Sequence, residues 1–140
     1  MATAPASGQP RVSVIIPHFN MPDALDRCLA SVTGQQFDGA VEIIVVDNGS
    51  RIRADAVIAR YPGVIALDEP TPGPGPARNT GVAAARAPVL VFIDADCRAE
   101  AGWLNAAVTA VEAAGPRGVV GGDVRIDFID PVRLTPVEAY

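Results

Sequence analysis

Short apolar segments rich in β-branched residues alternate with segments of helical periodicity, and this alternation leaves few folds open to the chain. The apolar segments lie at 12–16, 41–46, 64–67 and 89–93. The helical segments begin at Pro22 and continue at 54–61, 77–87 and 104–111. Apolar strands that alternate with helices predict an α/β fold, with a mostly parallel sheet covered by helices on both faces.

Two other segments refine this prediction. The stretch 68–76 holds four prolines and two glycines, which predicts a stiff loop without regular structure, and Pro76 suits the first position of the next helix. The small residues of that helix allow it to lie close to the sheet. After the last helix, Val119-Val120 and the alternating Val124, Ile126 and Phe128 are strand-like.

Length and composition are those of one soluble globular domain. The chain has 140 residues, of which 49% are hydrophobic and 19% charged, and its net charge of -5 argues against a nucleic-acid partner. No apolar stretch approaches the ~20 residues of a membrane helix, and the N-terminus is unlike a signal peptide. We expect a cytoplasmic protein, or one held at the inner face of the membrane through parts outside this chain.

The expected organisation is a flexible N-terminus over 1–10, a folded domain over 11–130 and the start of a further helix over 131–140. That helix is predicted from a capping box, Thr135-Pro136-Val137-Glu138, with proline at the first helical position. A chain that stops as a helix begins is expected to be truncated, and the alternative is a frayed terminal turn. An incomplete sheet would expose an apolar edge, which invites self-association.

Few residues are suited to nucleophilic or zinc chemistry. All 11 basic residues are arginines, so mechanisms that need a lysine are excluded. Cys28 and Cys97 lack the spacing of a zinc site and are too few for a disulfide framework, so Cys28 is assigned to the core. With His18 as the single histidine, a histidine-dependent nucleophile is disfavoured.

Polar residues follow each of the four predicted strands, at 17–20, 47–50, 68–76 and 94–96. In parallel α/β sheets, ligands bind beyond the carboxyl ends of the strands. Each segment alone could be only a turn, since Asp-Asn-Gly-Ser is ordinary turn chemistry. Their joint placement predicts a binding site at one edge of the sheet.

Asp94 and Asp96 place two carboxylates where a buried strand meets solvent. Hard cations such as Mg²⁺ or Mn²⁺ take one or two carboxylates together with substrate phosphates. The alternative is an acidic residue that only favours the dipole of the next helix. Arg78 and Asn79 are expected in the first turn of a helix that faces the same edge, where an arginine should pair with a carboxylate or a phosphate.

Four ordered motifs carry a family resemblance. They are Val14-Ile15-Ile16-Pro17-His18-Phe19-Asn20, Ile44-Val45-Val46-Asp47-Asn48-Gly49-Ser50, Ala77-Arg78-Asn79-Thr80-Gly81 and Phe92-Ile93-Asp94-Ala95-Asp96. From about Val12 to Gly122 the sequence resembles the nucleotide-sugar-binding half of family 2 glycosyltransferases, which have a Rossmann-like GT-A fold.

The resemblance implies transfer of a sugar, with inversion, from a nucleotide-diphospho-sugar to an acceptor hydroxyl, with Mg²⁺ or Mn²⁺ as cofactor. UDP is the family's commonest nucleotide. By resemblance, Asp96 of the DxD motif reaches the metal. The nucleotide-binding residues implied are Pro17, Phe19, Asn20, Asp47, Gly49, Arg78 and Asp94.

The general base and the acceptor site of the family usually lie further downstream. Asp123, Asp127 and Asp130 are not assigned as base, because Asp123 and Asp127 alternate with apolar residues and are expected to face solvent. No catalytic residue is therefore predicted in this chain, and the acceptor is unknown.

Other classes of protein share parts of this pattern. A haloacid-dehalogenase-type phosphatase or a receiver domain also places acidic residues at a strand end, but both rely on a lysine. A nucleotidyltransferase is the nearest enzymatic alternative, although its glycine-rich basic loop is absent from residues 17–21. The other alternative is a non-catalytic module that binds a nucleotide-sugar and metal.

Overall fold

The computed structural model describes residues 8–125. Its strands are β1 (Val12–His18), β2 (Val41–Asp47), β3 (Ile65–Asp68) and β4 (Val89–Phe92). Its helices are α1 (Pro22–Thr33), α2 (Asp55–Ile58), α3 (Pro74–Ala84) and α4 (Trp103–Ala114). The strands form one four-stranded sheet in the order β3-β2-β1-β4, and all three pairings are parallel. The predicted α/β fold is confirmed.

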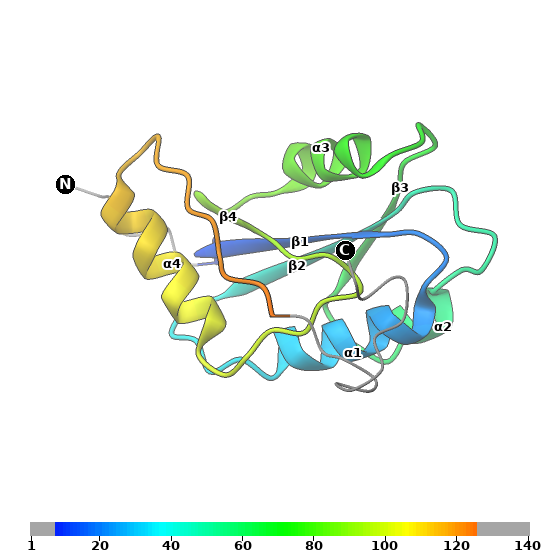
Figure 1. Ribbon diagram of the computed structural model, residues 1–140, viewed down its shortest axis with the longest axis horizontal. Coiled ribbons are helices and arrows are strands. Elements are labelled where there is room, and N and C mark those ends of the chain that lie inside the picture. The colour runs from blue at the N-terminus through cyan, green and yellow to red at the C-terminus, as the bar shows by residue number, and fades with distance from the viewer. Residues whose placement is uncertain (1–7, 126–140) are drawn as a thin grey trace.

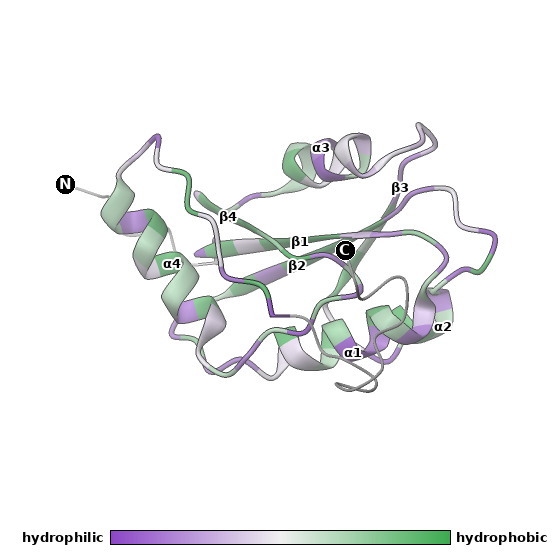
Figure 2. Ribbon diagram, in the orientation of Figure 1, coloured by the Kyte–Doolittle hydropathy of each residue, from purple (hydrophilic) through white to green (hydrophobic). Residues whose placement is uncertain are grey.

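Helices cover both faces of the sheet. In Figure 1, α3 lies on one side of the strands, and α1, α2 and α4 lie on the other. The larger core cluster joins Val14, Ile16 and Val45 of the strands to Leu25 and Leu29 of α1 and to residues of α2 and α4. Figure 2 shows α1 and α4 with bands of both hydrophobic and hydrophilic residues, as expected for helices that bury one side.

The second core cluster, under α3, is smaller. It contains Ile44, Val46 and Ala77. Gly81 of α3 lies against β1 so closely that a Cβ atom there would stand 2.5 Å from Cγ2 of Ile15. The prediction that small residues let this helix approach the sheet is confirmed.

Several predicted boundaries were wrong. The loop predicted over 68–76 is too long, because α3 already begins at Pro74. Prolines are tolerated in a first helical turn because the N–H groups there have no intrahelical acceptor. Arg78 consequently falls in the second turn of α3, not the first. The helix ends at Ala84 rather than 87, and α2 is a single turn, shorter than the predicted 54–61.

The strand-like assignment after α4 was also wrong within the described residues. Between 115 and 125 no strand forms, and Val119 and Val124 are exposed. Apolar alternation does not suffice for a strand without a partner whose backbone it can pair with. Ile126, Phe128, Asp127, Asp130 and the capping box at 135–138 lie outside the described residues.

The start of the described chain lies on the domain. Pro10 is buried, and Nε2 of Gln9 donates to the carbonyl of Arg86 at 3.0 Å. Residues 1–7 of the predicted flexible N-terminus lie outside the description. Among the described residues there is no helix of the length and apolar character that crossing a membrane requires.

Candidate nucleotide-binding groove

A groove of about 580 Å³ lies beyond the carboxyl ends of the strands. Residues that follow each of the four strands line it, so the predicted convergence of the strand ends is confirmed. Most of the lining is apolar, and the charged side chains are those of Arg78, Asp94 and Asp96. The lining residues are Pro17, His18, Phe19, Met21, Asn48, Gly49, Pro70, Pro72, Gly73, Pro74, Arg78, Asp94, Ala95 and Asp96.

Six of the eight predicted binding residues line this groove. They are Pro17, Phe19, Gly49, Arg78, Asp94 and Asp96. The other two, Asn20 and Asp47, are not among its lining residues. Their place in the structure indicates how the groove is held in shape.

Asn20 organises the loop that follows β2. Its φ of 54° lies in the left-handed region, which asparagine tolerates better than most residues. Its Oδ1 accepts hydrogen bonds from the backbone N–H groups of Arg51 and Ile52, at 2.7 and 3.0 Å. Its own N–H donates to Oγ of Ser50 at 2.9 Å. Asn20 thus ties the loop after β1 to the loop after β2.

Asp47 is buried at the end of β2 beside His18. Nδ1 of His18 donates to Oδ1 of Asp47 at 2.9 Å, and the N–H of Ser50 donates to Oδ2 at 2.9 Å. Burial raises the pKa of Asp47, but the hydrogen bonds from Ser50 and His18 outweigh it and hold the pKa below its ordinary value. Asp47 is therefore an ionised acceptor with a fixed orientation.

Arg78 and Asp94 form an ion pair within the groove. Nη2 of Arg78 lies 2.6 Å from Oδ1 of Asp94, with the side chains 37% and 54% exposed. The expectation that Arg78 pairs with a carboxylate is confirmed. Because both side chains keep access to solvent, the guanidinium retains donors that an incoming phosphate could use.

The acidic motif forms a turn rather than an extension of the strand. β4 ends at Phe92, the N–H of Cys97 donates to the carbonyl of Asp94 at 2.9 Å, and Ala95 is buried. This turn leaves Asp94 and Asp96 both exposed on the groove.

The carboxylates of Asp94 and Asp96 could supply part of the ligand set of a hard divalent cation. Within residues 8–125, no group of three or more histidine, cysteine or acidic side chains stands ready to enclose a metal. Mg²⁺ is commonly held by one or two carboxylates with the rest of its ligands from phosphates and water. Asp96, with Asp94 beside it, fits a metal that a diphosphate would complete.

Asn48 fixes the proline-rich wall of the groove. Its Nδ2 donates to the carbonyls of Glu69 and Thr71 at 2.9 and 2.7 Å. Its Oδ1 accepts from the N–H of Gly73 at 2.7 Å. Both donors and the acceptor of the amide are thus used to hold the loop between β3 and α3 against the end of β2. The Glu69 side chain, hydrogen-bonded to Thr80, ties the same loop to α3.

One side of α1 holds the segment that connects the acidic turn to α4. Cys28, Ser31 and Gln35 lie three and four positions apart, on one face of the helix and its C-terminal end. Sγ of Cys28 lies 3.6 Å from the carbonyl of Asp94, and Oγ of Ser31 accepts from the N–H of Ala99 at 2.9 Å.

Gln35 also replaces the missing cap of α4. The residue before α4 is Gly102, which has no side chain to offer, and Oε1 of Gln35 accepts from the N–H of Leu104 at 3.2 Å. Its Nε2 donates to the carbonyl of Glu100 at 2.9 Å.

Burial raises the pKa of the Cys28 thiol to about 12, consistent with its predicted core position.

No pattern in the sequence marks three residues that hold the site in shape: Asn48, Gln35 and Arg53, whose Nη1 lies 3.4 Å from Oδ2 of Asp47. Asn48 was visible only as part of a turn, and its neighbours in space are 21 to 25 residues away in sequence. Gln35 acts on residues 65 and 69 positions away. No local pattern marks such long-range bonds to backbone groups.

Comparison with known proteins assigns the family. The model of "Glycosyl transferase family 2" matches residues 13–135. Glycosyltransferase AglE of Haloferax volcanii is 33% identical over 137 residues, which cover 94% of this chain and 44% of AglE. The succinoglycan biosynthesis protein ExoO of Rhizobium meliloti is 31% identical, over 89% of this chain and 35% of ExoO.

A solved structure has the same fold. The mannosyltransferase PcManGT of Pyrobaculum calidifontis, in complex with GDP-Man and Mn²⁺, superposes with a TM-score of 0.64 at 26% identity. The match covers 76% of this chain and 33% of PcManGT. The chain thus spans less than half of the length of each of these relatives. The family model and the identity to AglE place this chain in glycosyl transferase family 2, with the GT-A fold.

Proposed function

We propose that this chain forms the donor-binding part of a glycosyltransferase that transfers a sugar, with inversion, from a nucleotide-diphospho-sugar to an acceptor hydroxyl. The observation that carries the proposal is the groove itself. It places Arg78, Asp94 and Asp96 together in an otherwise largely apolar lining at the carboxyl edge of a parallel sheet. An apolar site with a few convergent charged groups suits a ligand with a flat base and a charged diphosphate.

The relatives support the class of donor. PcManGT is described in complex with GDP-Man and Mn²⁺, and Staphylococcus aureus TarS 1-349, which shares the fold, is described in complex with UDP and with UDP-GlcNAc. We propose a UDP-sugar as the donor here and Mn²⁺ or Mg²⁺ as the metal.

We assign the following roles within the groove. Phe19, 54% exposed, offers an aromatic face to the base, and Pro17 and Gly49 border the nucleotide. Asn20 and Asp47 lie outside the lining and hold the loops behind it in place, while Arg78 and Asp94 face the diphosphate. Asp96 holds the metal.

The bound metal would neutralise negative charge that develops on the leaving diphosphate. The chain's own residues bind and orient the donor, and the guanidinium of Arg78 adds positive charge near the diphosphate. We assign no general base to the described residues. Asp123, the acidic residue beyond α4 within them, is exposed on a segment without a strand or helix.

Calorimetric titration with UDP, with and without Mn²⁺, tests the proposal. We expect binding that Mn²⁺ strengthens, and Asp96→Asn should remove the strengthening while the circular dichroism spectrum stays unchanged. Absent binding, or binding indifferent to Mn²⁺ and to Asp96→Asn, would contradict it. GDP and dTDP titrated in parallel establish the preferred base.

A second assay separates an enzyme from a binding module. Hydrolysis or transfer is measured with UDP-, GDP- and dTDP-sugars and Mn²⁺. Turnover of a sugar nucleotide supports the transferase. Tight binding without turnover identifies a donor-binding module, and formation of a sugar nucleotide from a nucleoside triphosphate and a sugar phosphate would identify a nucleotidyltransferase instead.

A further inference from the structure

The positive charge of the groove is already paired with one of its two carboxylates. Nη2 of Arg78 lies 2.6 Å from Oδ1 of Asp94, and Asp96 lies on the same turn as Asp94. The guanidinium thus cancels one of the two negative charges that would attract a cation into the groove. It also repels a cation by its own charge. In this arrangement the empty groove is a poor site for a metal ion.

The contact between Arg78 and Asp94 can be exchanged for another. It runs through one nitrogen, and the two side chains are 37% and 54% exposed. An exposed ion pair of this kind contributes little to stability. A diphosphate carries more negative charge than a carboxylate and can accept two N–H bonds from one guanidinium. It therefore competes well with Asp94 for Arg78.

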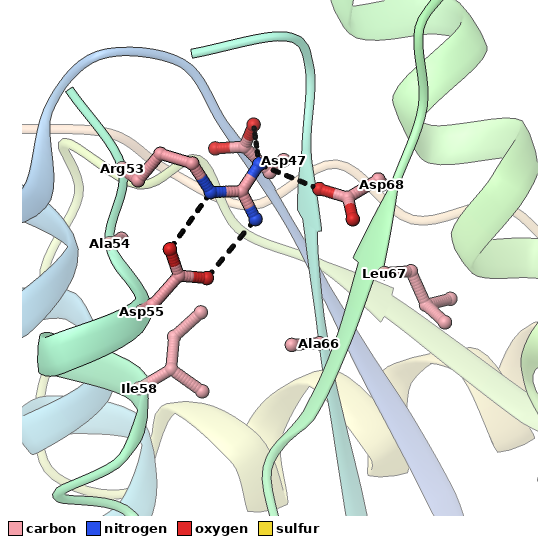
Figure 3. Close-up of a pocket in the computed structure, with 8 residues that line it drawn as sticks. All are labelled: Asp47, Arg53, Ala54, Asp55, Ile58, Ala66, Leu67 and Asp68. Atoms are coloured by element: carbon pink, nitrogen blue, oxygen red, sulfur yellow. Dashed lines mark hydrogen bonds and ion pairs between the residues drawn. The ribbon is translucent and has the colours of Figure 1, made fainter. Parts of the chain in front are cut away.

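The ion pairs of Arg53 show the opposite arrangement. Nε and Nη2 of Arg53 bind Asp55, and Nη1 binds Asp68. Figure 3 shows this guanidinium surrounded by carboxylates. All three of its nitrogens are engaged, so an incoming anion would have to replace several bonds at once. Of these two arginines, it is Arg78 whose partner a ligand can replace.

Resting on the proposed function, in which Arg78 and Asp94 face the diphosphate, we propose that Arg78 neutralises Asp94 in the empty groove and makes metal binding depend on the nucleotide. Without nucleotide, the guanidinium occupies Oδ1 of Asp94. A bound diphosphate takes over the guanidinium, and the carboxylate of Asp94 regains its full charge. The chain thereby disfavours a free metal ion and accepts the metal together with the donor.

This role predicts a gain of affinity when either partner is removed. Without Arg78, the metal alone should bind more tightly, because both carboxylates then keep their charge. Without Asp94, the nucleotide alone should bind more tightly, because the guanidinium has no competing partner. An ion pair that only stabilises the fold predicts neither gain. In the wild type, nucleotide and metal must raise each other's affinity by the same factor.

The first test measures Mn²⁺ binding without nucleotide, from the electron paramagnetic resonance signal of the free ion. Arg78→Met, which keeps an unbranched side chain without the charge, should bind Mn²⁺ about three- to tenfold more tightly than the wild type. Arg60→Met is the matched control. It removes the same charge and releases Asp26 from a pair of 3.0 Å, but neither residue lines the groove. Its Mn²⁺ affinity should stay within about twofold of the wild type.

The second test measures UDP binding without metal, by calorimetry. Asp94→Asn should bind UDP about two- to fivefold more tightly than the wild type, because Arg78 is released for the diphosphate. Asp96→Asn is the matched control, since it removes an equal charge from the same groove but leaves the pair between Arg78 and Asp94 in place. Its gain should be smaller. Circular dichroism establishes that each variant is folded.

Three results would overturn this role of Arg78. The first is a Mn²⁺ affinity of Arg78→Met that does not exceed that of the wild type, including no binding by either. The second is an equal gain in Arg60→Met, which identifies a general effect of charge. The third is a metal-free gain for UDP in Asp96→Asn as large as in Asp94→Asn.

The failure of this inference differs from the failure of the proposed function. If the wild type binds UDP more tightly with Mn²⁺ but any of these three results is found, the proposed function stands and the role of Arg78 falls. If the wild type binds no UDP even with Mn²⁺, the proposed function falls. The measurement with Mn²⁺ alone then still decides whether Arg78 neutralises Asp94.

Discussion

His18 and Asp47 are joined across the ends of β1 and β2 by a hydrogen bond of 2.9 Å between Nδ1 and Oδ1. The other ring nitrogen, Nε2, accepts from the backbone N–H of Met21 at 3.1 Å. An imidazole that donates through Nδ1 and accepts through Nε2 is the neutral Nδ1–H tautomer. His18 is 1% exposed. Its two hydrogen bonds connect the ends of two strands to the loop that lines the groove, so the role of this buried ring is structural.

His18→Phe should therefore destabilise the domain. The phenyl ring fills most of the same space but leaves Oδ1 of Asp47 without this donor and the N–H of Met21 without its acceptor. We expect a loss of about 2–3 kcal/mol in the free energy of unfolding, measured in urea. Phe19→Ala, at the neighbouring exposed position, should change it by less than about 0.5 kcal/mol. Equal stability of His18→Phe and the wild type would contradict this role.

The opposite end of the sheet predicts an acid-sensitive stability. Glu42 is buried and accepts from Oγ of Ser13 at 2.7 Å, from the N–H of Arg86 at 2.9 Å and from Nε of Arg86 at 2.6 Å. Burial raises the pKa of Glu42, but these bonds outweigh it and hold the pKa below its ordinary value of 4.5.

A pKa that is lower in the folded state gives stability that is fully present above the unfolded value and is lost as the pH falls through the folded one. The free energy of unfolding should thus decrease below about pH 4.5, and Asp47 adds to the decrease below its ordinary pKa of 3.8. Glu42→Gln should flatten this decrease in urea titrations from pH 7 to pH 3. Glu112→Gln, in an exposed pair with Arg11, should leave it in place. A Glu42→Gln profile parallel to that of the wild type would refute the assignment.

Gly81→Ala tests the close approach of α3 to β1. A Cβ at this position would lie 2.5 Å from Cγ2 of the buried Ile15, so the helix must shift away from the sheet. We expect the free energy of unfolding to fall by about 1–3 kcal/mol, although alanine is the better helix former. The control is Val82→Ala, at the adjacent position, where the side chain is 40% exposed. This substitution should change the free energy of unfolding by less than about 0.5 kcal/mol. A stabilised Gly81→Ala variant would show that the helix yields without cost.

Asn48→Asp tests whether the loop between β3 and α3 must be fixed for nucleotide binding. The substitution keeps the shape of the side chain but turns a carboxylate oxygen towards the carbonyls of Glu69 and Thr71. We expect UDP affinity to fall roughly tenfold or more, since two hydrogen bonds are lost and like partial charges meet.

Asn105→Asp is the matched control for that change. Nδ2 of Asn105 also donates to a backbone carbonyl, that of Gln36 at 2.7 Å, but away from the groove. Its UDP affinity, measured well below the unfolding temperature, should equal that of the wild type. If both variants bind UDP equally well, the loop does not depend on Asn48 for its binding conformation.

The fold class, and the edge of the sheet at which the site lies, could be predicted from the order of the residues alone. β-branched runs and helical stripes are local patterns, and a parallel arrangement brings all strand ends to one edge whatever the loops do. Arg78, Asp94 and Asp96 could be named for the same reason, because they directly follow or face these strand ends. The boundaries of α2 and α3 could not, since helix ends depend on tertiary contacts as well as on the residues themselves.

The contacts that hold the site in shape could be identified only in the folded chain. Asp47 turned out to be a buried acceptor between His18 and Arg53, rather than a side chain lining the groove. The amides of Asn48 and Gln35 bind backbone groups of loops that are distant in sequence. Hydrogen bonds and ion pairs form where folding brings donors and acceptors within about 3 Å of each other. Because the partners are distant in the sequence, their contacts produce no local or periodic sequence pattern from which they could be predicted.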